Sequence, residues 1–317
     1  MRSHMGGLFM ALVGALIGFI LRACFAIGFV LFLLPTVGLS TLLTMIENKT
    51  GIISPQTVSR IVLIFTKVSW WLAISACPWI RLRSAEDLPR QFQTLQAGLD
   101  DAQPTFMLGN HTSFFDTILT LAVVPITLVW RCRTYCTSKL LTMPLVGPLV
   151  KAHQHFIVPF KSKTDGDFSI DRKLMDEVNM QVEEFITAGG LLCFFPEGQL
   201  NSTPKKLMAF RFGGMKTALK HDAKLWAFVT RGCEVTWPKT AMLGGFPSDG
   251  GYSLRPLAPK GCVAKVLELK EKQPQKWEGK EDFEILGLWA QGMMQRQYDQ
   301  LGDLGMFFDD DIDDKID

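Results

Sequence analysis

A histidine and an aspartate lie five residues apart in the segment Asn110-His-Thr-Ser-Phe-Phe-Asp116. On a regular helix this offset turns the chain by roughly 140°, which is too far for the two side chains to meet. We therefore expect His111 to lie in a loop before a helix that Thr112 or Ser113 caps. Asp116 would then reach back to His111 from the first turn of that helix.

A histidine held in this way can act as a general base. The aspartate would accept a proton from one ring nitrogen and fix the tautomer, which leaves the other nitrogen to take a proton from a hydroxyl. A positioned base typically contributes a factor of about 10² to 10⁴ to a rate. A histidine near the start of a helix can equally be structural, so this interpretation needs a second element.

The second element is Phe194-Phe-Pro-Glu-Gly198, in which a carboxylate sits in a turn behind an apolar run. Residues 171–188 have the pattern of an amphipathic helix ended by two glycines. Residues 191–195 are apolar throughout, which is typical of a buried strand in a parallel sheet. The Pro-Glu-Gly turn would follow the carboxyl end of that strand.

Residues 105–109 are predicted to form another strand of the same sheet, directly before His111. Ligands of open α/β sheets bind at the carboxyl ends of the strands. The two strands would therefore bring His111 and Glu197 to one edge, where an acyl group could be transferred to a hydroxyl.

These motifs resemble those of the membrane-bound glycerolipid acyltransferases, particularly the 1-acyl-glycerol-3-phosphate (lysophosphatidic acid) acyltransferases, over about residues 80–237. Asn110-His-x4-Asp116 is similar to the catalytic motif of that family. The resemblance implies that His111 is the base and Asp116 its partner. It also assigns Asn110, beside the base, to substrate binding.

The resemblance extends to the segment that binds the glycerophosphate acceptor in the family, which Phe195-Pro-Glu-Gly198 matches. It implies that Glu197 and Gly198 shape the acceptor pocket. Phe210-Arg-Phe-Gly213 looks like the Phe-Lys-x-Gly stretch of the family, which makes its arginine a candidate phosphate ligand.

The chain departs from the family pattern where a phosphate would be held. Leu200 stands where the family has an arginine, so Arg211 is the best nearby cation, with Lys205 and Lys206 as weaker candidates or plain surface residues. Lys161 is the nearest match to the arginine of an intermediate motif. A lysine lacks the planar bidentate fork of arginine.

The predicted function is acyl transfer from acyl-CoA or acyl carrier protein to the hydroxyl of a lysophospholipid, most favourably lysophosphatidic acid. The thioester is a co-substrate, and neither a cofactor nor a metal is implied, because the seven cysteines show no zinc spacing. A short similarity to tafazzin-like enzymes leaves a CoA-independent phospholipid transacylase as an alternative. An inactive membrane scaffold on the same fold is another.

The N-terminal region is predicted to associate with a membrane. Residues 8–46 carry one charge, Arg22, over 39 residues, and about 20 apolar residues span a bilayer. A charge at the bilayer centre is costly, so we expect a surface segment before Arg22 and a span over residues 23–46 that is broken at Pro35. A helical hairpin and a signal peptide are alternatives.

Residues 61–80 form a second apolar segment with three tryptophans, which prefer the headgroup layer. It is predicted to lie in one leaflet, with a buried core helix as the alternative. Family resemblance would place such a protein in the endoplasmic reticulum membrane of a eukaryote or the inner membrane of a bacterium.

The charge distribution suits an anionic lipid surface, and no nucleic-acid partner is expected. The net charge is +2, and residues 309–317 hold six aspartates and one lysine, which leaves 32 basic and 25 acidic residues, a net of +7, in the rest of the chain. The organisation we predict is a membrane-associated helical region at 1–80, an acyltransferase domain at 81–301 and an acidic tail at 302–317. The sequence does not indicate an oligomeric state.

The domain is predicted to be α/β, with a mostly parallel sheet and flanking helices. Strands are expected at 105–109 and 191–195, a long loop at 244–259 and a terminal helix near 281–301. Further strands are expected at 134–138, 155–160, 225–230 and 262–267.

Overall fold

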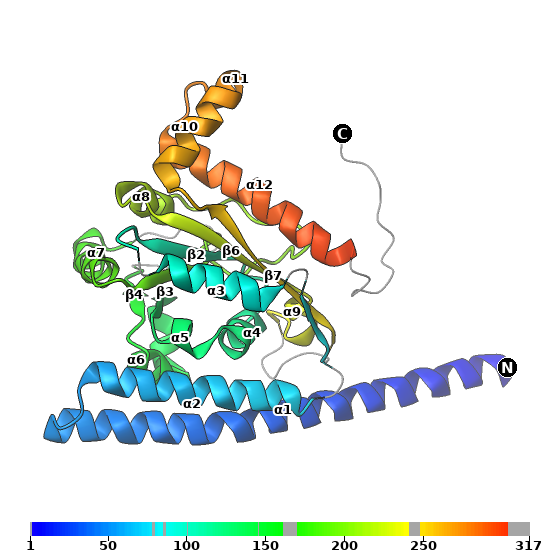
Figure 1. Cartoon of the computed structure of the whole chain (residues 1–317). Coiled ribbons are helices and arrows are strands. Elements are labelled where there is room, and N and C mark those ends of the chain that lie inside the picture. The colour runs from blue at the N-terminus through cyan, green and yellow to red at the C-terminus, as the bar shows by residue number, and fades with distance from the viewer. Residues whose placement is uncertain are drawn as a thin grey trace.

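Two long N-terminal helices lie antiparallel beneath an α/β domain in the computed structural model (Figure 1). The structure describes residues 2–77, 80–84, 87–99, 101–144, 146–160, 170–240 and 248–303. The residues predicted to form the acidic tail lie outside this part from residue 304 onward, and so does Lys161.

Seven strands form one sheet in the order β1-β7-β6-β2-β5-β3-β4. Neighbouring strands are parallel except β6 and β7, which are antiparallel. The predicted α/β class with a mostly parallel sheet is therefore confirmed. The strands are β1 (Leu82–Ser84), β2 (Thr105–Gly109), β3 (Cys132–Thr137), β4 (Phe156–Val158), β5 (Leu191–Phe194), β6 (Lys224–Arg231) and β7 (Gly250–Ala258).

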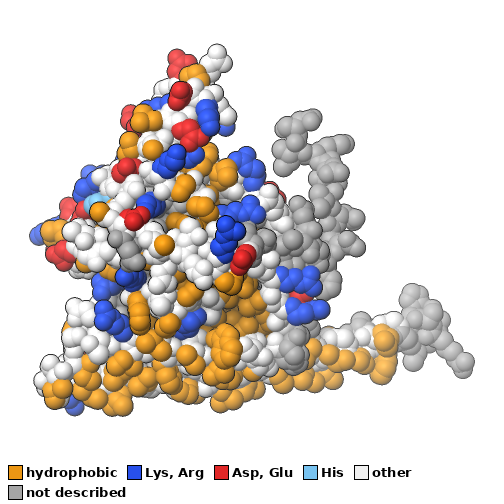
Figure 2. Space-filling view, in the orientation of Figure 1, with side chains coloured by type: hydrophobic (Ala, Val, Ile, Leu, Met, Phe, Trp, Pro, Cys, Tyr) orange, Lys and Arg blue, Asp and Glu red, His pale blue; other side chains and the backbone are white. Residues whose placement is uncertain are grey.

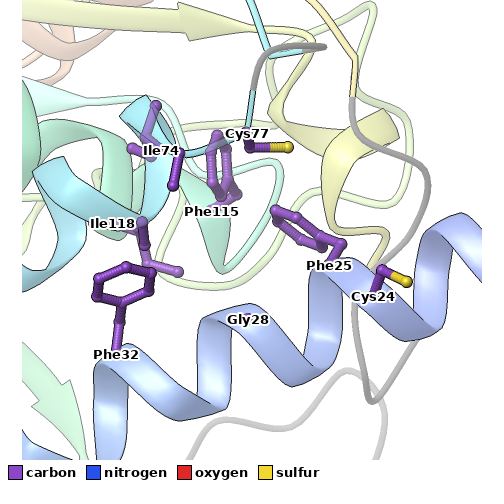
Figure 3. A pocket seen from close by; sticks show the side chains of 10 residues that line it. Cys24, Phe25, Gly28, Phe32, Ile74, Cys77, Phe115 and Ile118 are labelled. Atoms are coloured by element: carbon purple, nitrogen blue, oxygen red, sulfur yellow. The ribbon is translucent and has the colours of Figure 1, made fainter.

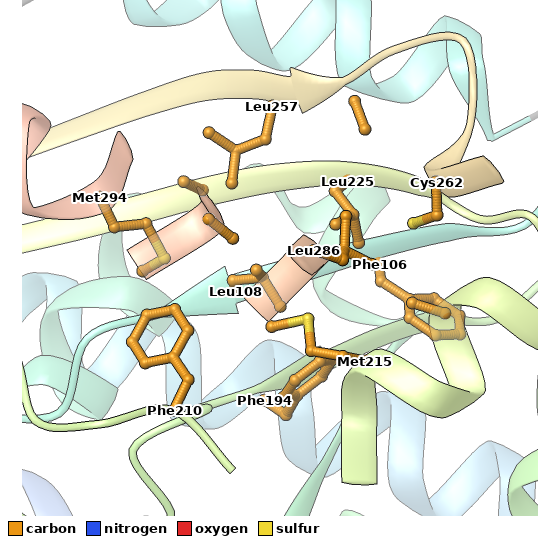
Figure 4. Close-up of a cluster of buried hydrophobic side chains, with 14 of the residues drawn as sticks. Phe106, Leu108, Phe194, Phe210, Met215, Leu225, Leu257, Cys262, Leu286 and Met294 are labelled. Carbon is orange, nitrogen blue, oxygen red and sulfur yellow. The ribbon is translucent and has the colours of Figure 1, made fainter. Parts of the chain in front are cut away.

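Helices cover both faces of the sheet, which explains why its central strands are apolar throughout. Phe106 and Leu108 of β2 face one cluster of buried side chains, and Met107 between them faces another, as the two-residue period of a strand requires. The first cluster packs the sheet against α7 (Arg172–Thr187), α8 (Gly213–Lys220), α10 (Cys262–Lys272) and α12 (Asp282–Asp303) (Figure 4).

The opposite face of the sheet is covered by α3 (Leu88–Gly98), α4 (Phe115–Val123) and α5 (Ile126–Val129). Short elements connect the rest: η1 (Ser138–Thr142), α6 (Gly147–Ala152), α9 (Cys233–Thr236) and α11 (Pro274–Trp277). Helix α4 is the element that matters most for the site, because it begins four residues after His111.

The N-terminal pair consists of α1 (Arg2–Thr50) and α2 (Pro55–Ser75). Ser54 caps α2 by accepting a hydrogen bond from Thr57 N at 3.2 Å, and Pro55 occupies the first helical position. Small polar residues dock α1: Thr36 Oγ1 donates to Ser69 Oγ at 3.0 Å and Ser40 Oγ donates to Pro148 O at 2.9 Å. The hairpin is thereby attached to α6 of the domain.

The lower surface of this hairpin is apolar (Figure 2). Helix α2 buries one side against α4 and α6, as expected of a core helix. Its other side exposes apolar side chains, as expected of a helix that lies in one leaflet. Both α1, over residues 12–50, and α2 are long and apolar enough to cross a membrane. The exposed apolar side chains include Phe9, Leu12, Leu16, Phe19, Ile27 and Leu31 of α1 and Ile61, Ile64, Phe65, Val68, Trp71 and Leu72 of α2.

The predicted division of the first apolar segment is wrong. Helix α1 continues from Arg2 to Thr50 through both Arg22 and Pro35. Proline removes one backbone donor, but the helix is long enough to persist on either side of that missing bond. The second apolar helix also starts earlier than predicted, at Pro55.

Two predictions near the C-terminus are also wrong. The apolar run 262–267 forms the start of α10 rather than a strand, because Cys262 and Val266, four residues apart, face the same core. The expected loop at 244–259 contains β7, although residues 241–247 lie outside the described part.

Strand β7 accommodates its proline because of its position in the sheet. Pro256 pairs with Trp226 where the register of β6 shifts, and β1 pairs only with residues 250–252. A proline is tolerated where a strand has an unpaired side or an irregular register.

Candidate active site

The two sequence motifs meet at the carboxyl end of the sheet. His111 lies two residues after β2 and Glu197 lies three residues after β5, and these two strands are adjacent and parallel. The backbone N–H of His111 donates to Glu197 Oε1 at 3.0 Å. The backbone N–H of Asn201 donates to His111 O at 2.6 Å, so the two loops are joined in both directions.

Asp116 lies behind His111 on the first turn of α4. Its Oδ2 is 3.4 Å from His111 Nδ1, which is buried and makes no well-directed hydrogen bond. Such contacts in substrate-free sites are often long and shorten in the complex with substrate. The side chain of Asp116 is 1% exposed and that of His111 is 19% exposed. The accessible part of the imidazole therefore lies away from Nδ1.

Four short contacts fix the carboxylate of Asp116. Oδ2 accepts from the backbone N–H groups of Thr112 at 2.6 Å and Ser113 at 2.7 Å. Oδ1 accepts from Thr230 Oγ1 at 2.9 Å and from Thr112 Oγ1 at 3.2 Å. A buried carboxylate is stable only when its lone pairs are satisfied in this way. The same contacts also fix its position relative to His111.

Ser113 rather than Thr112 supplies the hydroxyl at the start of α4. Ser113 Oγ accepts from Phe115 N at 2.9 Å and donates to Trp237 O at 2.6 Å. The helix start is thus attached to the segment after β6. This attachment helps to fix the first turn of α4, which carries Asp116, relative to the loop of His111.

Asn110 is buried and does not face the open side of the site. Its Nδ2 donates to Thr230 O at 2.8 Å, and its Oδ1 accepts from Thr230 N at 2.8 Å. The side chain continues the pairing of β2 with β6 past the end of β2. In the structure Asn110 thus supports the His111 loop, and its expected role in substrate binding stays a prediction.

Glu197 is likewise buried, with 1% exposure. Its Oε2 accepts from Asn201 Nδ2 at 2.9 Å and from Met208 N at 2.8 Å, in addition to the bond that Oε1 accepts from His111 N. Burial raises the pKa of Glu197, and the hydrogen bonds from the backbone of His111 and Met208 oppose that rise. The carboxylate therefore holds the loops around the site together.

Gly198 adopts φ +71°, which favours glycine, and the side chain of Arg211 lies directly across it. A Cβ at Gly198 would lie 2.5 Å from Arg211 Cδ and from Nε. The backbone N–H of Arg211 donates to Pro196 O at 2.7 Å. Arg211 is exposed, and its side chain lies over the Glu-Gly turn at Gly198.

The two lysine candidates, Lys205 and Lys206, are exposed in the turn after Asn201. Lys206 contributes to the site through its backbone, because its carbonyl oxygen accepts from Asn201 Nδ2 at 2.8 Å. Within the described residues, no group of three histidine, cysteine, aspartate or glutamate side chains could hold a metal ion.

The sequence analysis placed Phe195 at the end of a strand and in the Phe-Pro-Glu-Gly motif, but it did not predict the contact of this residue with His111. Its ring stacks on the imidazole of His111, with ring centroids 4.1 Å apart and an interplanar angle of 14°. A Cβ at Gly109 would lie 2.8 Å from Phe195 Cε1, so glycine is required there. The sequence held one signal for this contact. A glycine, Gly109, ends the strand before His111, and an aromatic residue, Phe195, follows the strand before Glu197.

An apolar pocket of about 210 Å³ lies between α1, α2 and α4. Phe25 and Phe32 of α1 and Phe115 and Ile118 of α4 lie around it (Figure 3). Phe115 precedes Asp116 directly, so this pocket adjoins the helix that carries the carboxylate of the site.

Replacement of Phe195 by leucine should slow the acyl transfer expected from the motifs without weakening substrate binding. Leucine keeps apolar contact but loses the stacked ring, and aromatic pairs contribute about 0.5–1.5 kcal/mol beyond their burial. We expect kcat to fall roughly three- to tenfold at constant KM, measured by steady-state kinetics.

The matched control is Phe194→Leu, because Phe194 lies in the core cluster and faces away from His111. This variant should lower the melting temperature and leave kcat of the remaining folded enzyme unchanged. Equal kcat in Phe195→Leu and the wild type would contradict the positioning effect of the stack.

Comparisons with known proteins agree with this geometry. A sequence model of the acyltransferase family matches residues 80–231. No curated protein sequence matches the chain significantly. Among solved structures, the chain is similar to the 1-acyl-sn-glycerophosphate (LPA) acyltransferase PlsC from Thermotoga maritima, with a TM-score of 0.59 and 14% identity over 89% of this chain and 97% of that one.

At 14% identity the likeness to PlsC shows a shared fold. The matched segment 80–231 contains the loop of His111, the start of α4 and the Glu-Gly turn, which together form the site. The resemblance noted from the motifs is thus confirmed over residues 80–231, which match the acyltransferase family.

Proposed function

We propose that this enzyme transfers a fatty acyl group from a thioester, acyl-CoA or acyl carrier protein, to the free hydroxyl of a lysophospholipid. Lysophosphatidic acid is the favoured acceptor, and phosphatidic acid would be the product. The observation that carries the proposal is the imidazole of His111, whose buried Nδ1 faces Asp116 while the accessible part of the ring faces away.

In the proposed reaction, Nε2 of His111 takes the proton of the acceptor hydroxyl as the oxygen attacks the thioester carbonyl carbon. Asp116 stabilises the imidazolium that forms. The tetrahedral intermediate then collapses, the carbon–sulfur bond breaks, and the imidazolium returns the proton to the thiolate that leaves. Every step is a proton transfer or an acyl transfer, so no oxidant, reductant or metal is required.

Arg211 is the proposed ligand of the acceptor phosphate. Its side chain crosses Gly198, and its planar fork suits two phosphate oxygens. The body of the chain up to residue 308 is basic, which favours an anionic acceptor. Glu197 contributes indirectly, by holding the turn that carries Gly198.

The apolar underside of α1 and α2 supports membrane association, because soluble proteins rarely expose such a large continuous apolar patch. Helix α2 packs on α4, so the catalytic loop lies one helix away from that surface. We propose that the hairpin attaches the enzyme to the membrane that contains its acceptor. In a eukaryote this would be the endoplasmic reticulum, and in a bacterium the inner membrane.

The pocket between α1, α2 and α4 is the proposed site for an acyl chain. Its named lining is apolar or aromatic, and it adjoins both the apolar surface and α4. Gly28 lines the pocket and has no atom within 4 Å of the position of an added Cβ, so a larger side chain there would enter space rather than clash.

The first test is acyl transfer by the detergent-purified protein from labelled acyl-CoA to a panel of lysophospholipids. We expect phosphatidic acid from lysophosphatidic acid, and a loss of about 10²- to 10⁴-fold in kcat for His111→Ala, because the base is removed. An intact phospholipid is offered as the alternative donor. Transfer from phospholipid alone would replace this proposal by transacylation, and inactivity with every donor would refute both.

Arg211→Ala should raise KM for lysophosphatidic acid about ten- to a hundredfold, since a hydrogen bond to a charged group is worth about 1.5–3 kcal/mol. KM for a monoacylglycerol, which has no phosphate, should be unchanged. Lys205→Ala is the control, because Lys205 is exposed on the neighbouring turn. An equal loss in Lys205→Ala, or an equal effect on both acceptors, would exclude Arg211 as the phosphate ligand.

Gly28→Leu should shift the acyl preference toward shorter chains. Each methylene excluded from an apolar site loses about 0.8 kcal/mol, so kcat/KM for long chains relative to short ones should fall roughly tenfold. Gly38→Leu is the control, because Gly38 also has open space at its Cβ but does not line the pocket. An unchanged chain-length profile in Gly28→Leu would show that the acyl chain binds elsewhere.

A further inference from the structure

A third carboxyl group, that of the partly buried Glu234 on α9, lies near Asp116 and shares the hydroxyl of Thr112 with it. Glu234 Oε2 is 3.5 Å from Thr112 Oγ1, and Oε1 is 3.4 Å from the hydroxyl of Tyr298 on α12. The same Thr112 hydroxyl is 3.2 Å from Asp116 Oδ1. A line of polar groups therefore runs from the C-terminal helix through Glu234 and Thr112 to the carboxylate beside His111.

The protons carried by Tyr298, Glu234 and Thr112 determine which hydrogen bonds these groups can form. The Thr112 hydroxyl has one proton to donate, and two carboxyl groups lie within its reach. If it donates to Asp116, the nearer of the two, its oxygen can still accept a hydrogen bond from Glu234 when Glu234 carries a proton. Tyr298 donates its own proton to the other oxygen of Glu234. With a neutral Glu234 every contact has one donor and one acceptor.

The surroundings of Glu234 favour that neutral form. Burial raises its pKa most, and the negative charge of Asp116 from α4 acts in the same direction. Hydrogen bonds from the backbone of Glu234 and Gly232 and the charge of Arg231 from β6 oppose the rise, and the net shift of the pKa is upward. Burial also raises the pKa of Tyr298, so its hydroxyl keeps the proton that it donates. The remaining titratable neighbour is Cys233 on α9, a fully buried thiol whose pKa is raised by burial first.

We propose that Glu234 is a positioning residue that, as a neutral acid held by Tyr298, directs the hydroxyl of Thr112 onto Asp116 and so orients the partner of His111. The inference deepens the proposed function, because it concerns the orientation of the proposed base. It places α12, which lies beyond the segment that matches the family, in the support of the active site.

The test that needs no substrate is the tautomer of His111. The full-length protein in detergent is labelled with ¹⁵N-histidine, and the signal of His111 among the five histidines is identified by its loss in His111→Gln. We expect the Nδ1–H form in the wild type, because Nδ1 faces Asp116. Glu234→Leu should give a mixture of both tautomers, and Tyr298→Phe a smaller shift in the same direction. Glu234→Gln should recover the wild-type tautomer, because its amide donates and accepts as the neutral acid does.

The rate of acyl transfer should be affected in the same variants as the tautomer. We expect kcat of acyl transfer to fall about tenfold or more in Glu234→Leu at constant KM, as small misplacements of catalytic groups do, with substantial recovery in Glu234→Gln. Gln297→Leu is the matched control, because Gln297 is a buried polar neighbour of Tyr298 that donates to Ser253 instead. It should lower the melting temperature without changing the tautomer or kcat.

Two outcomes would overturn the inference. A wild-type tautomer in both Glu234→Leu and Tyr298→Phe would reduce Glu234 to a structural residue, and damage in Glu234→Gln equal to that in Glu234→Leu would show that a charge is needed. If Glu234→Leu does not fold, Tyr298→Phe and Glu234→Gln still decide between these outcomes. An inactive wild type would remove the proposed function but leave the tautomer result valid.

Discussion

The site depends on the carboxylate of Glu197 more than on any other group. It accepts three N–H donors, from His111, Asn201 and Met208, which come from two loops that only the sheet brings together. A buried carboxylate without such donors would be costly, so the loops and the charge stabilise one another. Because one of the donors is the backbone of His111 itself, the Glu-Gly turn helps to set the position of the proposed base. The Glu-Gly turn therefore acts first through the geometry of the loops, and the side chain of Arg211 lies across it at Gly198.

Asp116 is a second buried carboxylate that is satisfied by hydrogen-bond donors. Its donors come from Thr112, Ser113 and Thr230, and they leave one side of Oδ2 directed to Nδ1 of His111. Phe195 lies against the ring face, while Asp116 lies at its edge, so the imidazole is constrained in both its plane and its rotation. Both carboxylates are nearly inaccessible, which leaves the imidazole as the exposed reactive group of the site. A base that is oriented before substrate arrives does not need to be reorganised during the reaction.

The sequence predicted those parts of the fold whose signals are local. The strands at 105–109 and 191–194 have continuous apolar runs that end at chemically distinctive turns, and the helix at 172–187 has a capping aspartate and a terminal glycine. Strand β7 escaped because its glycines and Pro256 indicate a loop unless the irregular register of β6 is known. Within the site, Thr230 reaches Asn110 across 120 residues, and no periodicity carries such a contact. The family pattern showed that Leu200 stands where an arginine is expected. That the side chain of Arg211 lies across Gly198, a glycine with positive φ, is seen only in the structure.

The active site also extends beyond the segment that defines the family. Residues 80–231 contain the base, its partner and the Glu-Gly turn, yet Ser113 is held by the carbonyl of Trp237, and α4 is covered by α2 on its outer side. The catalytic loop thus lies between the C-terminal elements and the N-terminal hairpin. Helix α4 contacts both α2 and α9, so the first turn of this helix, which carries Asp116, is packed between them. The apolar surface of the hairpin and the pair His111 and Asp116 therefore belong to one packed unit, which is the arrangement expected if the proposed acceptor resides in a membrane.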